Sequence, residues 1–116
     1  EMLFYEMAAA MLACVASGIS VESNHPSKAA LTDHIIPMES EFYCKVAHAV
    51  TGMKRSDAND LVKALLPKYE NALTNPPKGK KYQECYDVKT GKPKDEYLKF
   101  YKDMVKKIAD IGIPIE

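Results

Sequence analysis

The chain has 116 residues, of which 47% are hydrophobic and 28% charged, a composition that is typical of a globular domain and excludes a disordered chain. Its 16 basic and 16 acidic residues cancel, so the net charge gives no reason to expect a nucleic-acid or membrane partner. Residues 1–52 nevertheless carry a net charge of −4 and the remainder +4, which we interpret as solvated helical faces rather than as two surfaces that attract each other.

The three cysteines, Cys14, Cys44 and Cys85, lie far apart and form no Cys-x-x-Cys pair. This pattern indicates reduced thiols in a cytoplasmic protein rather than a disulfide framework. Met11 to Cys14 weakly resembles a lipoprotein cleavage site, but Glu6 interrupts the apolar run and no basic residue precedes it. The run is also shorter than the ~20 residues that span a bilayer, so we expect neither export nor membrane insertion.

The first predicted element is a helix over residues 2–16, which are rich in Ala, Met and Leu and are followed by Ser17-Gly18. Because this helix is apolar on nearly every side, we expect it to be buried on every side, with protein beyond this chain covering it. Since the chain begins at Glu1 with the helix already under way, we also expect the natural N-terminus to lie upstream. Ile19 to Glu22 then alternates as in a short strand, and Asn24 to Ser27 predicts a turn.

Two further helices are predicted in the middle of the chain. One runs from Met38 to about Val50 and is expected to bury Phe42, Val46 and either Ala49 or Val50. The next begins at Ser56-Asp57 and runs through Leu73, since apolar residues recur every four positions at Leu61, Leu65, Tyr69 and Leu73. Within it, Pro67 removes the hydrogen bond to the carbonyl of Lys63, which predicts a kink.

Asn75 to Gly79, with two prolines and a glycine, predicts an interruption of helical structure. The last helix is predicted to begin at Pro93, with acidic residues in its first turn, as the helix dipole favours. It ends at Gly112, and its predicted apolar face consists of Tyr97, Tyr101, Met104, Ile108 and Ile111. The sequence therefore predicts a mainly α chain of about four helices and one short strand.

Few residues suggest a metal-binding, catalytic or phosphate-binding role. Cys44 and His48 have zinc-ligand spacing on one helix, and His25 or His34 offers a further ligand, but we interpret the pair as packing. A Cys–His nucleophile at this pair is disfavoured because its helix face is mostly apolar. The five glycines mark element boundaries rather than a phosphate-binding loop.

A basic and aromatic cluster, Lys78, Lys80, Lys81, Tyr82 and Tyr86, has the composition of a nucleic-acid contact. Acidic residues interrupt this cluster, however, and no nucleic-acid motif frames it. We therefore expect no nucleic-acid partner.

The most distinctive residues lie between residues 79 and 93 and follow neither a helix nor a strand repeat: Gly79, Lys80, Tyr82, Gln83, Glu84, Cys85, Tyr86, Asp87 and Lys89. With Pro77, Pro93 and Glu96-Tyr97, this stretch resembles the C-terminal segment of the monomethylamine methyltransferases of methanogenic archaea. The likeness extends upstream and covers essentially the whole chain, through Glu1-Met2, Glu6 to Ala8, Thr32-Asp33, Met38-Glu39, Val46-Ala47, Ala49, Thr51-Gly52 and Tyr69-Glu70. It is weakest over Asn24 to Pro37, and Pro67 departs from the pattern.

The resemblance implies an enzyme that moves a methyl group from monomethylamine to the cobalt of a separate corrinoid protein, at a site with an amber-encoded pyrrolysine inside an α/β TIM barrel. Such a barrel needs ~250 residues, so the resemblance implies the C-terminal end of this enzyme. Residues 1–37 would be the last buried helix, short strand and loop of the barrel, and residues 38–116 a C-terminal helical extension.

No catalytic residue, cofactor-binding residue or metal ligand is therefore expected in this chain. Asn24 and His25 would lie nearest the catalytic face. The cofactor would be the corrinoid (cobalamin) of the partner protein, and the partners would be that cognate corrinoid protein, monomethylamine and further copies of the enzyme in the cytoplasm, with neither nucleic acid nor membrane. The alternatives are a free-standing helical protein-interaction module and an independent thiol or metal enzyme.

Within the distinctive stretch, the resemblance and the flanking helices together favour a structured connection. We expect Tyr82, Cys85 and Tyr86 to pack. We expect Glu84, Asp87 and Lys89 to bond backbone or partner groups that hold the connection in place.

Overall fold

The computed structural model describes residues 1–21 and 31–116. Its helices are α1 (Met2–Ala16), α2 (Pro37–Ala49), α3 (Arg55–Leu65), α4 (Tyr82–Cys85) and α5 (Asp95–Ile111), with two 3-10 turns, η1 (Leu66–Lys68) and η2 (Glu70–Ala72). The described residues contain no strand, and one isolated antiparallel bridge pairs Tyr86 with Pro93. The predicted mainly α class is confirmed.

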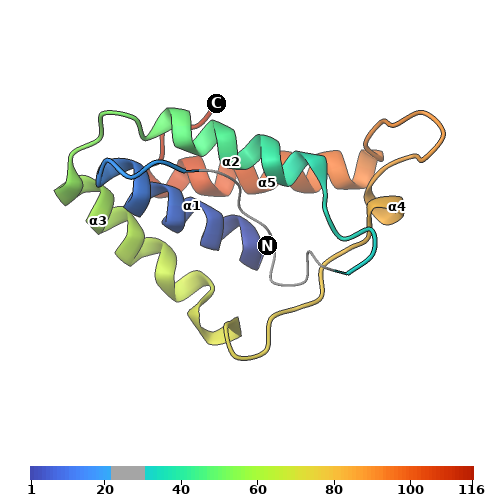
Figure 1. Cartoon of the computed structure of the whole chain (residues 1–116), viewed down its shortest axis with the longest axis horizontal. Coiled ribbons are helices and arrows are strands. Elements are labelled where there is room, and N and C mark those ends of the chain that lie inside the picture. The colour runs from blue at the N-terminus through green and yellow to red at the C-terminus, as the bar shows by residue number, and fades with distance from the viewer. Residues whose placement is uncertain (22–30) are drawn as a thin grey trace.

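Helix α1 lies among the other long helices and contacts α2, α3 and α5 (Figure 1). The ring of Phe4 on α1 packs edge-on against Phe42 of α2, with centroids 4.9 Å apart, and against Phe100 and Tyr101 of α5 at 5.8 and 6.2 Å. Met7, Met11 and Leu12 on the same helix are almost completely buried. Three helices of the chain thus cover much of α1, but Leu3, Ala10 and Cys14 are only half-buried and Ala13 is exposed. That protein beyond this chain completes the cover stays a prediction.

The predicted strand at Ile19 to Glu22 is also wrong over the part that is described. Gly18, with φ of 72°, donates its N–H to the carbonyl of Val15 at 3.1 Å, and Ile19 donates to that of Cys14 at 2.9 Å. These bonds close the end of α1, and the second uses the N–H of Ile19, the first residue of the predicted strand. Glu22 and the turn predicted at Asn24 to Ser27 lie outside the described residues.

The third predicted helix is shorter than expected. Helix α3 ends at Leu65, and the chain continues as η1 and η2 instead of one kinked helix to Leu73. Pro67 has no N–H for the carbonyl of Lys63, and its ring collides with the preceding turn, so the tighter 3-10 geometry replaces the α-helix. This change of geometry rotates the later residues off the buried face: Leu65 is fully buried, whereas Leu73 is 49% exposed.

The other two helices bury their predicted faces, although α5 begins at Asp95 rather than at Pro93. On α2, Phe42 and Val46 are buried, as is Val50 just after its end, and a proline occupies the first turn. On α5, Tyr97, Tyr101, Met104 and Ile108 face the core, while Ile111 is half-buried. Beyond the end of α5, Ile113 and Ile115 return to the same core, so the final residues help to hold α5 in place.

Candidate functional site

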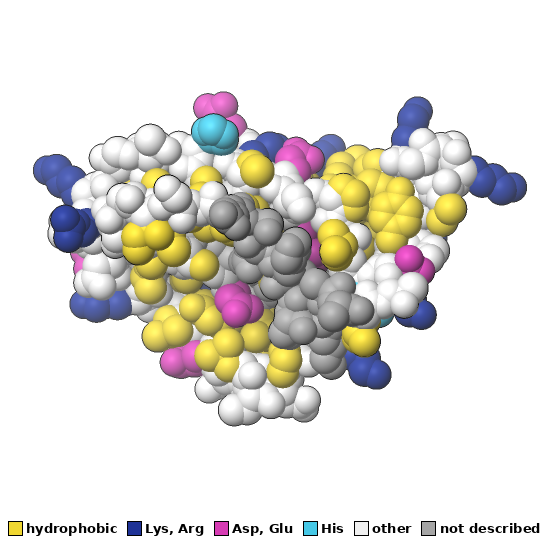
Figure 2. Space-filling model, viewed as in Figure 1, with side chains coloured by type: hydrophobic (Ala, Val, Ile, Leu, Met, Phe, Trp, Pro, Cys, Tyr) yellow, Lys and Arg dark blue, Asp and Glu magenta, His cyan; other side chains and the backbone are white. Residues whose placement is uncertain are grey.

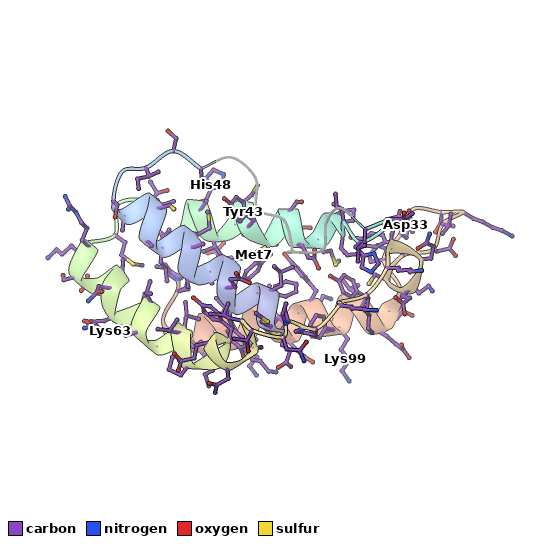
Figure 3. The ribbon with its side chains drawn as sticks, turned by 60° about the horizontal axis from the view of Figure 1, so that its bottom comes forward. Met7, Asp33, Tyr43, His48, Lys63 and Lys99 are labelled. Carbon is purple, nitrogen blue, oxygen red and sulfur yellow. The ribbon has the colours of Figure 1, made fainter. Side chains whose placement is uncertain are left out.

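The distinctive stretch forms a helical turn, α4, followed by a loop that projects from one end of the molecule (Figure 1). The carboxylate of Glu84 accepts a hydrogen bond of 2.6 Å from the backbone N–H of Lys81, which caps the start of the turn. Tyr82 donates its backbone N–H to the carbonyl of Asp33 at 2.7 Å, and Figure 3 shows Asp33 at this end of the molecule. The turn is thus attached to the segment that precedes α2.

The loop after α4 is organised around Asp87. Its carboxylate accepts the backbone N–H groups of Lys89 and Thr90 at 2.8 and 3.0 Å. Its own N–H and carbonyl bond to Lys92 and Gly91, each at 2.8 Å. The hydrogen bonds from Thr90 and then Lys89 hold the pKa of the Asp87 carboxyl below its usual value.

Beneath this loop, Cys85 and Tyr86 are buried, and the half-buried ring of Tyr82 stacks on that of Tyr86 at 4.9 Å, so all three pack as expected. Burial raises the pKa of the Cys85 thiol, which keeps it protonated and weakly nucleophilic at neutral pH. The side chain of Lys89 is exposed, and only its backbone N–H holds the loop. Of the three residues expected to bond, Glu84 and Asp87 do so through their side chains.

Cys44 and His48 both lie on the exposed side of α2, where Figure 3 labels His48, so the pair does not pack within this chain as we interpreted it. His34 is half-buried and hydrogen-bonds through its ring to the carbonyl of Thr32 at 2.8 Å, while Asn24 and His25 lie outside the described residues. Over residues 1–21 and 31–116, no three His, Cys, Asp or Glu side chains gather in a way that could hold a metal ion. In the same ranges no helix has the length and apolar character needed to cross a bilayer.

On the face shown in Figure 2, the basic side chains lie mostly around the edge and the hydrophobic ones toward the middle. Lys78, Lys80 and Lys81 are exposed. Tyr86 is buried and stacked on Tyr82, so its ring is not available for a base.

A pocket of about 480 Å³ opens beside the start of α1. Its apolar wall includes Phe4, Ile36 and Phe100, and its polar groups include Glu39 from the first turn of α2 and Tyr97 from α5. Sequence reasoning missed this pocket, because its residues come from the starts of α1, α2 and α5 and from the chain between residues 73 and 80. Helical periodicity indicates only that Tyr97 faces inward.

Two polar groups of the pocket lining are partly or fully shielded from water. Burial raises the pKa of the Glu39 carboxyl to about 7, although a hydrogen bond from the backbone of Ile36 opposes this shift. The Tyr97 side chain is only 6% exposed, and its buried hydroxyl has no hydrogen-bond partner among the described residues. Burial raises the pKa of the Tyr97 phenol, and the nearby negative charge of Glu39 raises it further.

Comparison with known proteins gives concordant matches. The family model described as monomethylamine methyltransferase MtmB matches residues 1–113. The monomethylamine methyltransferase MtmB of Methanosarcina mazei is 40% identical over 97% of this chain and 25% of its own length. The MtmB1 protein of Methanosarcina acetivorans is 38% identical over the same shares.

A solved structure agrees with these sequence matches. The crystal structure of the Methanosarcina barkeri monomethylamine methyltransferase MtmB aligns with a TM-score of 0.88 and 35% sequence identity, over 97% of this chain and 25% of that one. The chain therefore spans about a quarter of the length of the relatives that it matches.

Proposed function

The chain belongs to the monomethylamine methyltransferase MtmB family, and from this premise we propose that it acts as the C-terminal part of an enzyme that transfers a methyl group from monomethylamine to the cobalt of a corrinoid protein. The observation that carries the proposal is the family match over residues 1–113. The structural match to the Methanosarcina barkeri protein over 97% of the chain supports it.

Within that enzyme, the role of this segment is structural rather than catalytic. The polar side chains of the distinctive stretch are engaged in holding the chain: Gln83 bonds to Asp33, Glu84 caps α4, and Asp87 organises the loop. Cys85 is buried with a raised pKa, which does not suit a nucleophile. The pyrrolysine and the methylamine site would lie in the TIM barrel, outside residues 1–116.

In this proposal the boundary between the barrel and its helical extension lies at residue 37. Residues 1–37 would belong to the barrel and residues 38–116 to the helical extension. Because α2, α3 and α5 pack on α1, the extension would enclose the last helix of the barrel. The side chains of Phe42 and Tyr101, which pack on Phe4, would then join the two parts through one hydrophobic core.

The partners of the whole enzyme would be monomethylamine, the cognate corrinoid protein and further copies of the enzyme, in the cytoplasm. The apolar face of α5 supports intramolecular packing, because Tyr97, Tyr101 and Met104 are buried within this chain. Contacts between copies would therefore use other residues. Among residues 1–21 and 31–116, the exposed large hydrophobic side chains are Ile19, Leu31, Ile35, Leu66, Leu73 and Val88.

A chimaera tests the proposal. The matching last quarter of the Methanosarcina mazei relative is replaced by this chain, and the protein is produced in a methanogen host. Methyl transfer from monomethylamine to the corrinoid protein is then measured. We expect the chimaera to be active and the isolated chain to be inactive.

Cys85→Ser in the chimaera separates a structural role from a catalytic one. A structural Cys85 predicts reduced thermal stability with the methyl-transfer rate per folded enzyme unchanged. Methyl transfer by the isolated chain, or a folded chimaera that binds the corrinoid protein without turnover, would contradict the proposal.

A further inference from the structure

A shallow groove lies between the end of α1 and the start of α3, at the opposite end of α1 from the pocket beside Phe4. Its volume is about 320 Å³, and on the left of Figure 2 hydrophobic side chains lie open where α1 ends beside α3. The floor of the groove consists of Leu12, Ala13, Ala16, Ala58 and Val62. A segment that presents apolar side chains would therefore bury hydrophobic surface here.

Helix α1 has an apolar face that this chain leaves partly open to water. Every residue of α1 except Glu6 is hydrophobic, and a helix of this kind is normally buried all round. Yet Ala10 is half-buried and Ala13 is exposed. These two residues lie three positions apart and so share one face of the helix. That face continues into the groove, because Ala13 forms part of its floor.

The rim of the groove is polar and carries one unpaired cation. It consists of Ser17, Arg55 and Asn59, all of them exposed. Arg55 is the only arginine of the chain, which has 15 lysines, and it has no ion-pair partner among residues 1–21 and 31–116. A guanidinium binds a carboxylate through two parallel hydrogen bonds, which suits an ion pair at an interface better than an ammonium does. The rim therefore favours a partner segment with a carboxylate at its edge.

The length of the relatives indicates where this segment comes from. The chain spans about a quarter of their length, and the crystal structure of the Methanosarcina barkeri relative has the same fold over 97% of this chain. The helices that form the groove are thus arranged in the same way within a full-length protein. In the proposed function α1 is the last helix of a TIM barrel, in which the helices surround the strands. Since α2, α3 and α5 pack on the other sides of α1, its open face is the one available to the barrel.

We propose that an apolar segment from the remaining three quarters of the enzyme's own polypeptide lies in the groove between α1 and α3, and that an Asp or Glu of this segment pairs with Arg55. This inference rests on the proposed function. It gives the helical extension a second contact with the barrel, through α3, in addition to the core around Phe4.

Zero-length cross-linking in the chimaera identifies the partner of Arg55. The Arg55→Lys variant keeps the positive charge, and a carbodiimide joins the new amine to a carboxylate in contact with it as an amide. We expect mass spectrometry to find this amide linked to an Asp or Glu of the relative's part of the same polypeptide. A mixture of unlabelled and ¹⁵N-labelled copies distinguishes links within one chain from links between two. A link to a second copy, links to this chain alone, or no link at position 55 overturns the proposal.

Thiol labelling measures whether the groove is covered. Ala13→Cys in the folded chimaera should react with N-ethylmaleimide about a hundredfold more slowly than in the urea-unfolded enzyme. The matched control is Ala64→Cys, because Ala64 is also an exposed alanine but lies on α3 outside the groove. Its rate should stay within about tenfold of the unfolded rate. Equal rates at the two positions in the folded enzyme contradict a segment lying in the groove.

Charge reversal tests the ion pair itself. Arg55→Glu should lower the midpoint of thermal denaturation of the chimaera by about 2 °C or more, because two carboxylates would then face each other. Lys54→Glu is the control, since Lys54 is adjacent and exposed but does not line the groove, and it should not lower the midpoint. Equal effects of the two reversals overturn the pairing. These measurements do not depend on methyl transfer, so an active chimaera with an open groove would refute this inference and leave the proposed function intact.

Discussion

The side-chain amide of Gln83 donates a hydrogen bond of 2.6 Å to the carboxylate of Asp33, 50 positions earlier in the chain. The backbone carbonyl of the same Asp33 accepts the N–H of Tyr82 at 2.7 Å. Asp33 itself has a φ of 63°, a left-handed conformation that Asp tolerates better than most residues. These two bonds connect α4 to the approach to α2, which neither element could specify alone.

Replacing Gln83 by Glu should destabilise this connection. A second carboxylate would face Asp33, so the hydrogen bond becomes a repulsion, and we expect the free energy of unfolding to fall by about 1 kcal/mol. Urea denaturation at neutral pH measures the change. Adding Asp33→Asn supplies a new donor and should recover most of the loss. Equal stability of Gln83→Glu and the unchanged chain would show that the bond contributes nothing.

The carboxylate of Asp87 should organise its loop, whereas the side chain of Lys89 should not. The hydrogen bonds from Thr90 and Lys89 depress the pKa of Asp87 in the folded chain. Its stabilising contribution is therefore present above the unfolded-state pKa and is lost as the pH falls through the folded one. NMR titration should give a pKa below 3.8, the ordinary value for an aspartic acid side chain.

Alanine substitutions provide the matched comparison for this loop. Asp87→Ala should speed hydrogen exchange at the amides of Lys89 and Thr90, because both lose their acceptor. Lys89→Ala keeps the backbone donor and should leave exchange at Thr90 unchanged. If both variants exchange alike, the loop does not depend on the carboxylate.

Burial of Glu39 should make the stability of the chain depend on pH in the sense opposite to that of Asp87. Because the folded-state pKa is raised from 4.5 to about 7, the folded state binds more protons between these values. Stability is thus highest below the unfolded-state pKa and falls as the pH rises toward 7. Glu39→Gln should remove this dependence and stabilise the chain by about 1–2 kcal/mol at pH 8, after allowance for solvent screening.

Thermal denaturation at pH 5 and pH 8 measures the effect of Glu39. Glu41→Gln is the control, since Glu41 is exposed and pairs with Lys45, and it should not alter the difference between the two pH values. An equal pH dependence in Glu39→Gln and the unchanged chain would contradict the raised pKa.

Replacing Gly112 by alanine should destabilise the chain more than replacing another glycine at the end of an element, such as Gly91. Its φ is 123°, and a Cβ at this position would lie 3.1 Å from Cδ2 of Leu61 on α3. Gly112→Ala therefore combines backbone strain with a collision between the end of α5 and α3, and we expect a loss of about 2 kcal/mol. Gly91, with φ of 68°, has nothing within 4 Å of the added atom, so Gly91→Ala should cost about 1 kcal/mol.

Chemical denaturation of the two alanine variants separates strain from collision. In a double-mutant cycle with Leu61→Ala, the coupling energy reports the contact with Leu61, and the loss that remains reports the backbone strain at φ of 123°. A coupling energy of zero would mean that the Leu61 side chain shifts to accept the methyl group at no cost.

The sequence by itself determined the helices whose apolar residues recur at helical spacing, such as Phe42 and Val46 on α2 and Tyr97 to Ile108 on α5. It also indicated the family, through the distinctive stretch between residues 79 and 93. Local spacing is sufficient for these conclusions, since a helix presents residues three and four apart on one face regardless of what covers that face.

Only the tertiary structure decided what covers α1, where the α3 helix ends, and how Glu39 and Tyr97 come to line one pocket. Each depends on residues that are distant in sequence: α1 packs against α2, α3 and α5, and the pocket joins the starts of α1, α2 and α5. Pro67 shows the limit of a periodic pattern. Tyr69 and Leu73 keep the four-residue spacing, but the 3-10 turns after Leu65 alter the rotation per residue, and Leu73 therefore lies exposed at the rim of the pocket instead of in the core.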